Sequence, residues 1–256
     1  MVDIIVRARN NHVMTANCLA SIRRNTPPGV YRIILSDDGS DPSLSDALTD
    51  VFIRSRDSHG AVTATNLGLG VSLNLFDSEY ALILDNDVLI PDGDLGWLAR
   101  MITELEDGGP GTACVAATSG YSSPPQHILS VPQTYTADWN DEDGHGGYKD
   151  NLPVKWFISY CVLFRKTALK EIGSWDERYN PGNWEDTDYS VRVRLAGYQI
   201  RVARSVYVNH LGSKTFSDQL KRLLIENGEK FREKWSVGTL LDLGFISPQE
   251  LKEMSQ

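Results

Sequence analysis

Long apolar runs are absent from this sequence of 256 residues. No stretch approaches the ~20 consecutive apolar residues that a helix needs to cross a bilayer, so we expect no transmembrane segment. The first residues, MVDIIVRARNN, have no basic start, no long apolar run and no small-residue cleavage site. They are typical of a strand, and we expect no secretion signal.

Cysteine is scarce, with Cys18, Cys114 and Cys161 as the three in the chain. Their number is odd, they are widely spaced, and each lies in an apolar segment. This pattern indicates reduced core residues rather than a disulfide framework or a zinc site. A reducing, cytoplasmic location is therefore expected.

Basic residues are also fewer than acidic ones. The 25 lysines and arginines are outnumbered by 34 aspartates and glutamates, which gives a formal net charge of −9 and a pI near 5.0. Proteins that coat nucleic acid neutralise its phosphates with basic side chains, so nucleic acid is not expected as a partner. A small phosphorylated ligand is compatible with this charge, because a divalent cation held by carboxylates can carry positive charge to it.

The first half of the chain offers alternating strands and helices. The predicted strands are residues 2–7, 31–35, 51–54 and 81–84, and the helices between them are 12–24 and 61–76. Such alternation is typical of a parallel sheet with right-handed crossovers. With 41% hydrophobic and 23% charged residues, the chain is expected to form one α/β domain over 1–256.

After about residue 105 the alternation weakens, and the chain is expected to elaborate the same sheet. The elements predicted here are strands at 112–118, 155–165 and 199–208, helices at 184–196 and 211–235, and a short final helix after the capping box that begins at Ser247. Residues 138–151 are polar and rich in glycine. Two interpretations of them stay open: a solvated loop, or a lid that closes over a ligand.

Polar clusters follow three of the predicted strands. The first strand ends in residues 7–11 (RARNN), the second in 36–40 (SDDGS) and the fourth in 85–87 (DND). Alone, the second cluster would be read as an ordinary turn. Because ligands of an open parallel sheet bind outside the carboxyl ends of its strands, the three clusters together predict a binding site at that edge.

Of the three polar clusters, the one with Asp85 and Asp87 is the most specific indication of a binding site. Two carboxylates one residue apart, directly after a buried strand, can serve a hard cation and its ligand together. Mn²⁺ or Mg²⁺ is the expected cofactor, because such ions take few protein oxygens and complete their coordination with water and substrate phosphates.

Taken in order, the motifs of the chain resemble those of nucleotide-diphospho-sugar glycosyltransferases with the GT-A fold, closest to the large family two. The resemblance covers roughly residues 1–215 and rests on the order of the set rather than on any one member. The motifs are Arg9-Asn10, Ser36-Asp37-Asp38-Gly39-Ser40, His59-Gly60, Thr65-Asn66-Leu67-Gly68, Asp85-Asn86-Asp87, Gly173-Ser174-Trp175-Asp176-Glu177, Trp184-Glu185-Asp186-Thr187-Asp188, Arg192, Arg194, Gly197-Tyr198, and Val208-Asn209-His210-Leu211-Gly212-Ser213.

The resemblance implies a fold and a division of the chain. The fold is a mostly parallel, Rossmann-like central sheet flanked by helices, with a smaller acceptor-side sheet and C-terminal helices. Residues 1–110 would form the nucleotide-binding half, 111–215 the acceptor and catalytic half, and 216–256 a helical extension.

It also implies roles for individual residues. Asp38 would read the edge of the nucleobase, Asp85 would meet the ribose or sugar, and Asp87 would hold the metal at the diphosphate together with His210. Arg7 and Arg9 stand where the family usually has Thr or Tyr, so the donor is expected to be of either the UDP or the GDP type. The donor-binding residues would be Arg7, Ala8, Arg9, Asp38, Asn66, Asp85 and Asn86.

The segment that begins at Trp184 has both a structural and a catalytic interpretation. Acidic residues favour the first turn of a helix, and Asp188 can pair with Arg192 at i,i+4. The resemblance makes Asp186 the general base, with Trp184, Glu185 and Asp188 on the acceptor side. Several aromatic side chains could stack on a sugar, although core packing is at least as good an interpretation for the last three: Trp139, Tyr148, Trp156, Trp175 and Trp184.

The function expected from this resemblance is metal-dependent transfer of a sugar from a nucleotide diphosphate to a carbohydrate or other hydroxyl acceptor, with inversion. The alternatives are a retaining enzyme of the same fold, a sugar nucleotidyltransferase, and a nucleotide-sugar or carbohydrate-binding module without turnover. Arg9-Asn10-Asn11-His12 lacks the glycines of a triphosphate-gripping loop, which disfavours the nucleotidyltransferase. A homo-oligomer is compatible with the sequence.

Overall fold

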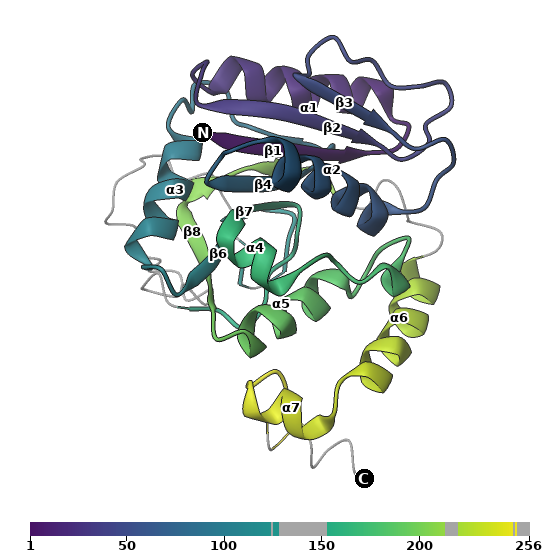
Figure 1. Ribbon diagram of the computed structural model, residues 1–256, viewed down its shortest axis with the longest axis vertical. Helices are drawn as coiled ribbons and strands as arrows, with labels where there is room; N and C mark the ends of the chain where they lie inside the picture. The colour runs from purple at the N-terminus through teal and green to yellow at the C-terminus, as the bar shows by residue number, and fades with distance from the viewer. Residues whose placement is uncertain (124, 128–152, 213–219, 248, 250–256) are drawn as a thin grey trace.

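The computed structural model describes residues 1–123, 125–127, 153–212, 220–247 and 249. Its centre is a seven-stranded sheet with the order β3-β2-β1-β4-β7-β6-β8 (Figure 1). The strands are β1 (Val2–Ala8), β2 (Tyr31–Asp37), β3 (Val51–Arg54), β4 (Tyr80–Asp85), β6 (Thr112–Thr118), β7 (Cys161–Arg165) and β8 (Gln199–Tyr207).

Most of the sheet is parallel, as the sequence predicted. β1 pairs in parallel with β2 and β4, β2 with β3, and β6 with β8. β7 is the exception, because it runs antiparallel to both of its neighbours, β4 and β6. A second, two-stranded antiparallel sheet joins β5 (Val88–Leu89) to β9 (Asn209–His210).

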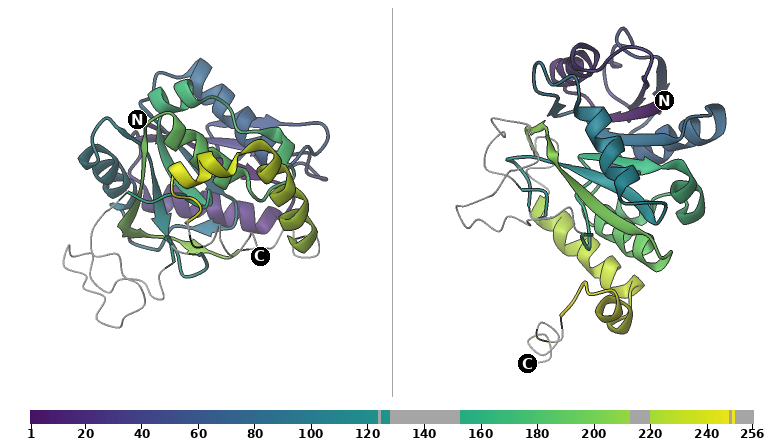
Figure 2. Two further views of the ribbon diagram at one scale, coloured as in Figure 1. Left: turned by 90° about the horizontal axis from the view of Figure 1, so that it is seen from below. Right: turned by 90° about the vertical axis from the view of Figure 1, so that its left-hand side faces the viewer.

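Helices cover both faces of the sheet. α1 and α3 share one apolar core with the sheet, and α2, α4 and α5 share the other, because alternate side chains of each strand point to opposite faces. In the left-hand view of Figure 2 the sheet lies between these layers. The helices are α1 (His12–Asn25), α2 (Ala61–Leu75), α3 (Trp97–Asp107), α4 (Lys166–Ile172), α5 (Glu185–Leu195), α6 (Leu220–Lys234) and α7 (Val237–Asp242).

The small residues of α2 have a packing reason. Gly68 faces β1, and a Cβ added there would lie 2.3 Å from Cγ2 of Ile5. Only glycine permits this approach of helix to strand. α2 begins at Ala61, near the carboxyl end of β2, where the N–H of Gly60 before it donates to Asp38.

The C-terminal elements differ from the sequence prediction. A helix was predicted over 211–235, whereas α6 begins at Leu220 within the described residues. α7 was not predicted; Ser236 caps it by accepting a hydrogen bond from the Thr239 backbone N–H. Most of the predicted final helix lies outside the described residues, as does the polar segment 138–151 with Trp139 and Tyr148. α6 and α7 lie at the end of the molecule opposite α1 (Figures 1 and 2).

The prediction for the cysteines is confirmed. All three cysteines are buried and unpaired. Among the residues that the structure describes, no helix combines the length and the apolar character that crossing a membrane requires.

Candidate active site

A cleft of about 730 Å³ opens at the carboxyl ends of β1, β2 and β4. The three polar strand ends therefore meet, because Arg7 is the register partner of both Ser36 and Asp85. Most residues singled out in the sequence line this cleft, from both halves of the chain: Arg7, Ala8, Arg9, Asp38, Asp85, Asn86, Asp87, Trp184, Glu185, Asp186 and His210.

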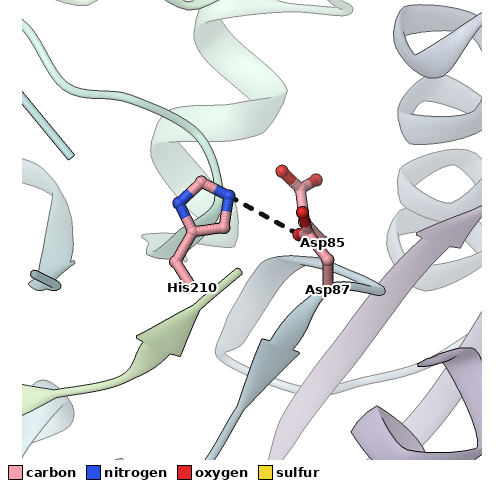
Figure 3. A group of neighbouring side chains, drawn as sticks. All are labelled: Asp85, Asp87 and His210. Atoms are coloured by element: carbon pink, nitrogen blue, oxygen red, sulfur yellow. Dashed lines mark ion pairs between the residues drawn. The ribbon is translucent and has the colours of Figure 1, made fainter. Parts of the chain in front are cut away.

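Asp85, Asp87 and His210 form a compact group of potential metal ligands. Their ligand atoms all lie within 4.8 Å of one another. Figure 3 shows the carboxylates of Asp85 and Asp87 facing the same edge of the His210 ring. The chain brings them together through the small sheet, where Val88 pairs with His210 and the Leu211 N–H donates to the Asp87 carbonyl at 3.0 Å.

The imidazole of His210 is held in one orientation. Its Nδ1 lies 2.9 Å from the carbonyl oxygen of Tyr121, and its ring stacks on Tyr160 with centroids 4.6 Å apart. A carbonyl can only accept, so Nδ1 is the donor of this contact, and Nε2 is the ring nitrogen that faces Asp87. Nε2 lies 3.5 Å from Oδ1 of Asp87.

Asp87 fits a cation at this position. Its Oδ1 is buried and accepts no hydrogen bond from the described residues. Burial and the neighbouring charge of Asp85 raise the pKa of Asp87 to about 6. A carboxylate oxygen that lacks a hydrogen-bond donor, beside Asp85 and the Nε2 of His210, belongs to a donor set suited to Mn²⁺ or Mg²⁺.

Arg7 lies at the base of the cleft and is 8% exposed. Its Nε donates to Asp85 Oδ1 at 2.5 Å, and its terminal nitrogens donate to Thr65 Oγ1 at 3.1 Å and to Ser159 Oγ at 2.9 Å. Most of its N–H groups are thus used within the protein. The guanidinium is placed to orient Asp85.

Glu185 and Asp186 enter the cleft from the first turn of α5. Burial, together with the charge of Asp186, raises the pKa of Glu185 to about 8, and burial raises the pKa of Asp186 to about 6. Attraction to Arg7 opposes both increases. Asp186 Oδ1 accepts from the Thr187 N–H at 2.8 Å, whereas Glu185 Oε2 is buried and accepts nothing from the described residues.

Asp38 and Asn86 line the cleft, and each also forms hydrogen bonds to a neighbouring segment of the protein. The Asp38 carboxylate accepts from Ser58 Oγ at 2.7 Å, from the His59 N–H at 2.8 Å and from the Gly60 N–H at 2.9 Å, which ties β2 to the start of α2. The Asn86 amide donates to Thr15 Oγ1 on α1 at 2.8 Å.

Asn66 and Asp188 are not brought to the cleft. The Asn66 side chain binds the backbone of Trp175 and the carboxylate of Glu177. Asp188 is fully buried and pairs with Lys234 at 2.7 Å, so the predicted pair with Arg192 is wrong. Arg192 instead donates to the carbonyl oxygens of Ile172 and Ser174.

The aromatic candidates divide in the same way. Trp156 and Trp184 line the cleft. Trp175 is a core residue, stacked on Tyr189 with centroids 4.5 Å apart. Sequence reasoning missed other cleft residues, which carry no motif of their own: Tyr121, Ser159, Tyr160, Leu220 and Leu224.

The sequence of this chain matches a known protein family. The family model described as Glycosyl transferase family 2 matches residues 3–173, about two thirds of the chain. The chain belongs to glycosyltransferase family 2. The matched part contains Asp38, Asp85 and Asp87, while Asp186 and His210 lie beyond its end.

One curated relative of this family-two chain is chondroitin synthase of Pasteurella multocida (strain Pm70). The two are 27% identical over an alignment of 225 residues, and the match covers 74% of this chain and 22% of that protein. The chain therefore spans less than a quarter of the length of this relative.

Solved structures agree on the fold. A mannosyltransferase, PcManGT, from Pyrobaculum calidifontis in complex with GDP-Man and Mn²⁺ has a TM-score of 0.63 at 16% identity, over 94% of this chain and 67% of that one. GalNAc-T7 with UDP, GalNAc and Mn²⁺ has a TM-score of 0.60 at 12% identity, over 82% and 43%. S. aureus TarS has a TM-score of 0.57 at 13% identity, over 87% and 38%. The family-two chain has the GT-A fold that the sequence predicted.

Proposed function

We propose that this chain transfers a sugar from a nucleoside-diphosphate donor to an acceptor hydroxyl, with inversion at the anomeric carbon. The observation that carries the proposal is the meeting of two groups in one cleft: the candidate cation-binding set Asp85, Asp87 and His210, and the carboxylates of Glu185, which is buried, and Asp186, which is half-buried. A module that only binds sugar or nucleotide has no use for the second group.

Residues 1–110 would bind the donor. Asp38 would accept a hydrogen bond from the nucleobase, and Asp85, oriented by Arg7, would accept from a hydroxyl of the ribose or sugar. Asp87 and His210 would hold Mn²⁺ or Mg²⁺, which when bound neutralises charge on the leaving diphosphate. Support for a UDP or GDP donor comes from the complexes of PcManGT with GDP-Man and Mn²⁺ and of GalNAc-T7 with UDP and Mn²⁺.

Residues 111–215 would supply the base and most of the acceptor side. An acceptor hydroxyl is a poor nucleophile at neutral pH, so a carboxylate must take its proton as the new bond forms. Asp186, with a pKa raised to about 6, is largely ionised at neutral pH yet basic enough for this role. Glu185, with a pKa raised to about 8, is largely protonated there and can donate a hydrogen bond to the acceptor.

The acceptor is proposed to be a carbohydrate. Trp156 and Trp184 present aromatic surface to the cleft, and such rings stack on sugars. A base on one side of the sugar and the leaving diphosphate on the other describe a single in-line displacement, which inverts configuration.

The test is a panel of UDP- and GDP-sugars assayed with Mn²⁺ for nucleotide release, without and with carbohydrate acceptors. Transfer from one donor with inverted configuration, read by NMR of the anomeric proton of the product, is the expected result. Retained configuration would overturn the mechanism alone. If no member of the panel were hydrolysed or transferred, and none raised the melting temperature with Mn²⁺, the proposed function would be overturned.

A further inference from the structure

α6 lies beside residues 179–184, the segment that leads into α5 (Figure 1). Asn227 of this helix is 1% exposed. Its side-chain NH₂ group, with two hydrogens, lies within hydrogen-bond distance of three carbonyl oxygens, one hydrogen being shared: Tyr179 at 2.9 Å, Gly182 at 2.9 Å and Asn183 at 3.1 Å. One buried side chain thus holds the backbone of this segment at three points.

The segment needs such support because its backbone is unusual. Asn183 and Trp184 have φ values of 74° and 73°, in the left-handed region that side chains other than glycine rarely adopt. Residues in this region stay there only when their surroundings hold them. The two residues directly precede Glu185 and Asp186, so their conformation sets the direction in which the first turn of α5 presents the two carboxylates.

The same helix also fixes the indole of Trp184. Its Nε1 donates to the carbonyl oxygen of Leu224 at 2.9 Å, and its ring packs against Phe231 with centroids 5.0 Å apart. The ring lies over Gly228, where an added Cβ would come within 3.2 Å of it. α6 therefore determines both the backbone and the side chain at the entrance to α5.

We propose that Asn227 is a positioning residue of the transfer site. Its amide holds the left-handed turn at Asn183 and Trp184, and the turn keeps Trp184 and Asp186 where acceptor and donor meet. The inference rests on the proposed function. Asn227 is not among the residues that line the cleft, so its effect on the transfer would pass through the segment that it holds.

The test compares Asn227→Ala with Leu240→Ala. Leu240 is a buried residue of α7 whose truncation loosens the C-terminal part without removing a bond to the turn. In Asn227→Ala, kcat at saturating donor should fall on the order of 10²-fold, as a small misplacement of reacting groups does, with the donor KM within about twofold of wild type. Leu240→Ala should keep both values within about twofold.

A second readout does not depend on activity. The Asp188 backbone N–H donates to the Trp184 carbonyl at 2.9 Å, so its hydrogen exchange reports on the turn. Exchange there should quicken in Asn227→Ala more than in Leu240→Ala. Asn227→Ser, which also removes the amide donors but keeps a small polar group, should repeat both effects and serves if Asn227→Ala does not fold.

Unchanged kcat in Asn227→Ala, or exchange at Asp188 no faster than in Leu240→Ala, would overturn the proposal. A wild-type chain that transfers no sugar would instead count against the proposed function. The exchange comparison would then still decide whether Asn227 holds the turn.

Discussion

Arg7 and Asp85 are register partners at the ends of β1 and β4, and their side chains form an ion pair with 2.5 Å between Nε and Oδ1. By attraction, the same guanidinium also limits the increase that burial causes in the pKa of Glu185 and of Asp186. One buried cation thus serves carboxylates from both halves of the chain. It links the donor side of the cleft to the proposed base.

Replacing Arg7 with Met should shift the pH dependence of transfer. Without the guanidinium, the carboxylates of Glu185 and Asp186 lose an attraction that stabilises their ionised forms, so the pKa of each rises further. The acid limb of the kcat profile, expected near the Asp186 pKa of about 6, should therefore move to higher pH. Arg7→Lys should move it less. Arg24→Met, which removes an exposed pair with Asp92, should leave the profile unchanged, and an unchanged profile in Arg7→Met would contradict the role given to Arg7.

Removing either proposed metal ligand should abolish the Mn²⁺-dependent binding of nucleotide. Wild type should gain about 2.7 kcal/mol of stability with nucleoside diphosphate and Mn²⁺ at 100 times Kd, measured by thermal denaturation. Asp87→Ala and His210→Ala should lose most of that gain, whereas Asp92→Ala, on an exposed carboxylate, should keep it. An equal gain in EDTA would show that nucleotide binds without the cation.

Replacing Asp38 with Asn should weaken donor binding without slowing the chemistry. A hydrogen bond to the base stabilises ground state and transition state alike, so its loss raises the donor KM, by about ten- to a hundredfold, with kcat within about twofold. Asp38 also holds the loop at residues 58–60, so a change in the loop must be distinguished from a lost contact with the base. Inhibition by Mn²⁺-pyrophosphate, which lacks the base, serves as the control. A Ki for pyrophosphate that rises as much as the donor KM would show that Asp38 acts through the loop rather than through the base. Asp57→Asn, on a neighbouring exposed residue, should alter neither value.

The donor half of the site could be predicted from sequence because it depends on local order. Each polar cluster directly follows its strand, and parallel strands bring such ends to one edge, so Asp38, Asp85 and Asp87 meet as expected. The direction of β7 could not be predicted, since a buried apolar run of five residues has the same pattern in either direction.

Residues at the C-terminal side were harder to assign because distant partners replace local ones. The i,i+4 rule favoured a pair between Asp188 and Arg192. Lys234 and the indole N–H of Trp235, which lie far along the chain, bind Asp188 Oδ1 at 2.7 and 2.9 Å instead. Likewise nothing in the sequence around Asn227 distinguishes a buried amide from an exposed one.

Asp186→Asn should remove the proposed base while keeping the shape of the side chain. We expect kcat to fall by about 10²–10⁴, the usual contribution of general base catalysis, with nucleotide affinity retained. Rapid-quench measurement of a single turnover would separate this chemical step from product release. A variant that retains most of its kcat would assign the base elsewhere, with Glu185→Gln as the next substitution to measure.

The same Asp186→Asn variant should be more stable than wild type, by an amount that depends on pH. The pKa of Asp186 is raised from 3.8 to about 6 in the folded protein, because burial disfavours the charge. Folding therefore opposes ionisation: the cost is absent below about pH 4, grows up to about pH 6 and is complete above that. Asn removes it, so the melting temperature should exceed that of wild type by about 5 °C at about pH 7 and match it at about pH 4. Asp92→Asn should show no gain at either pH, and a gain for Asp186→Asn that is equal at both would mean that the buried charge is not its source.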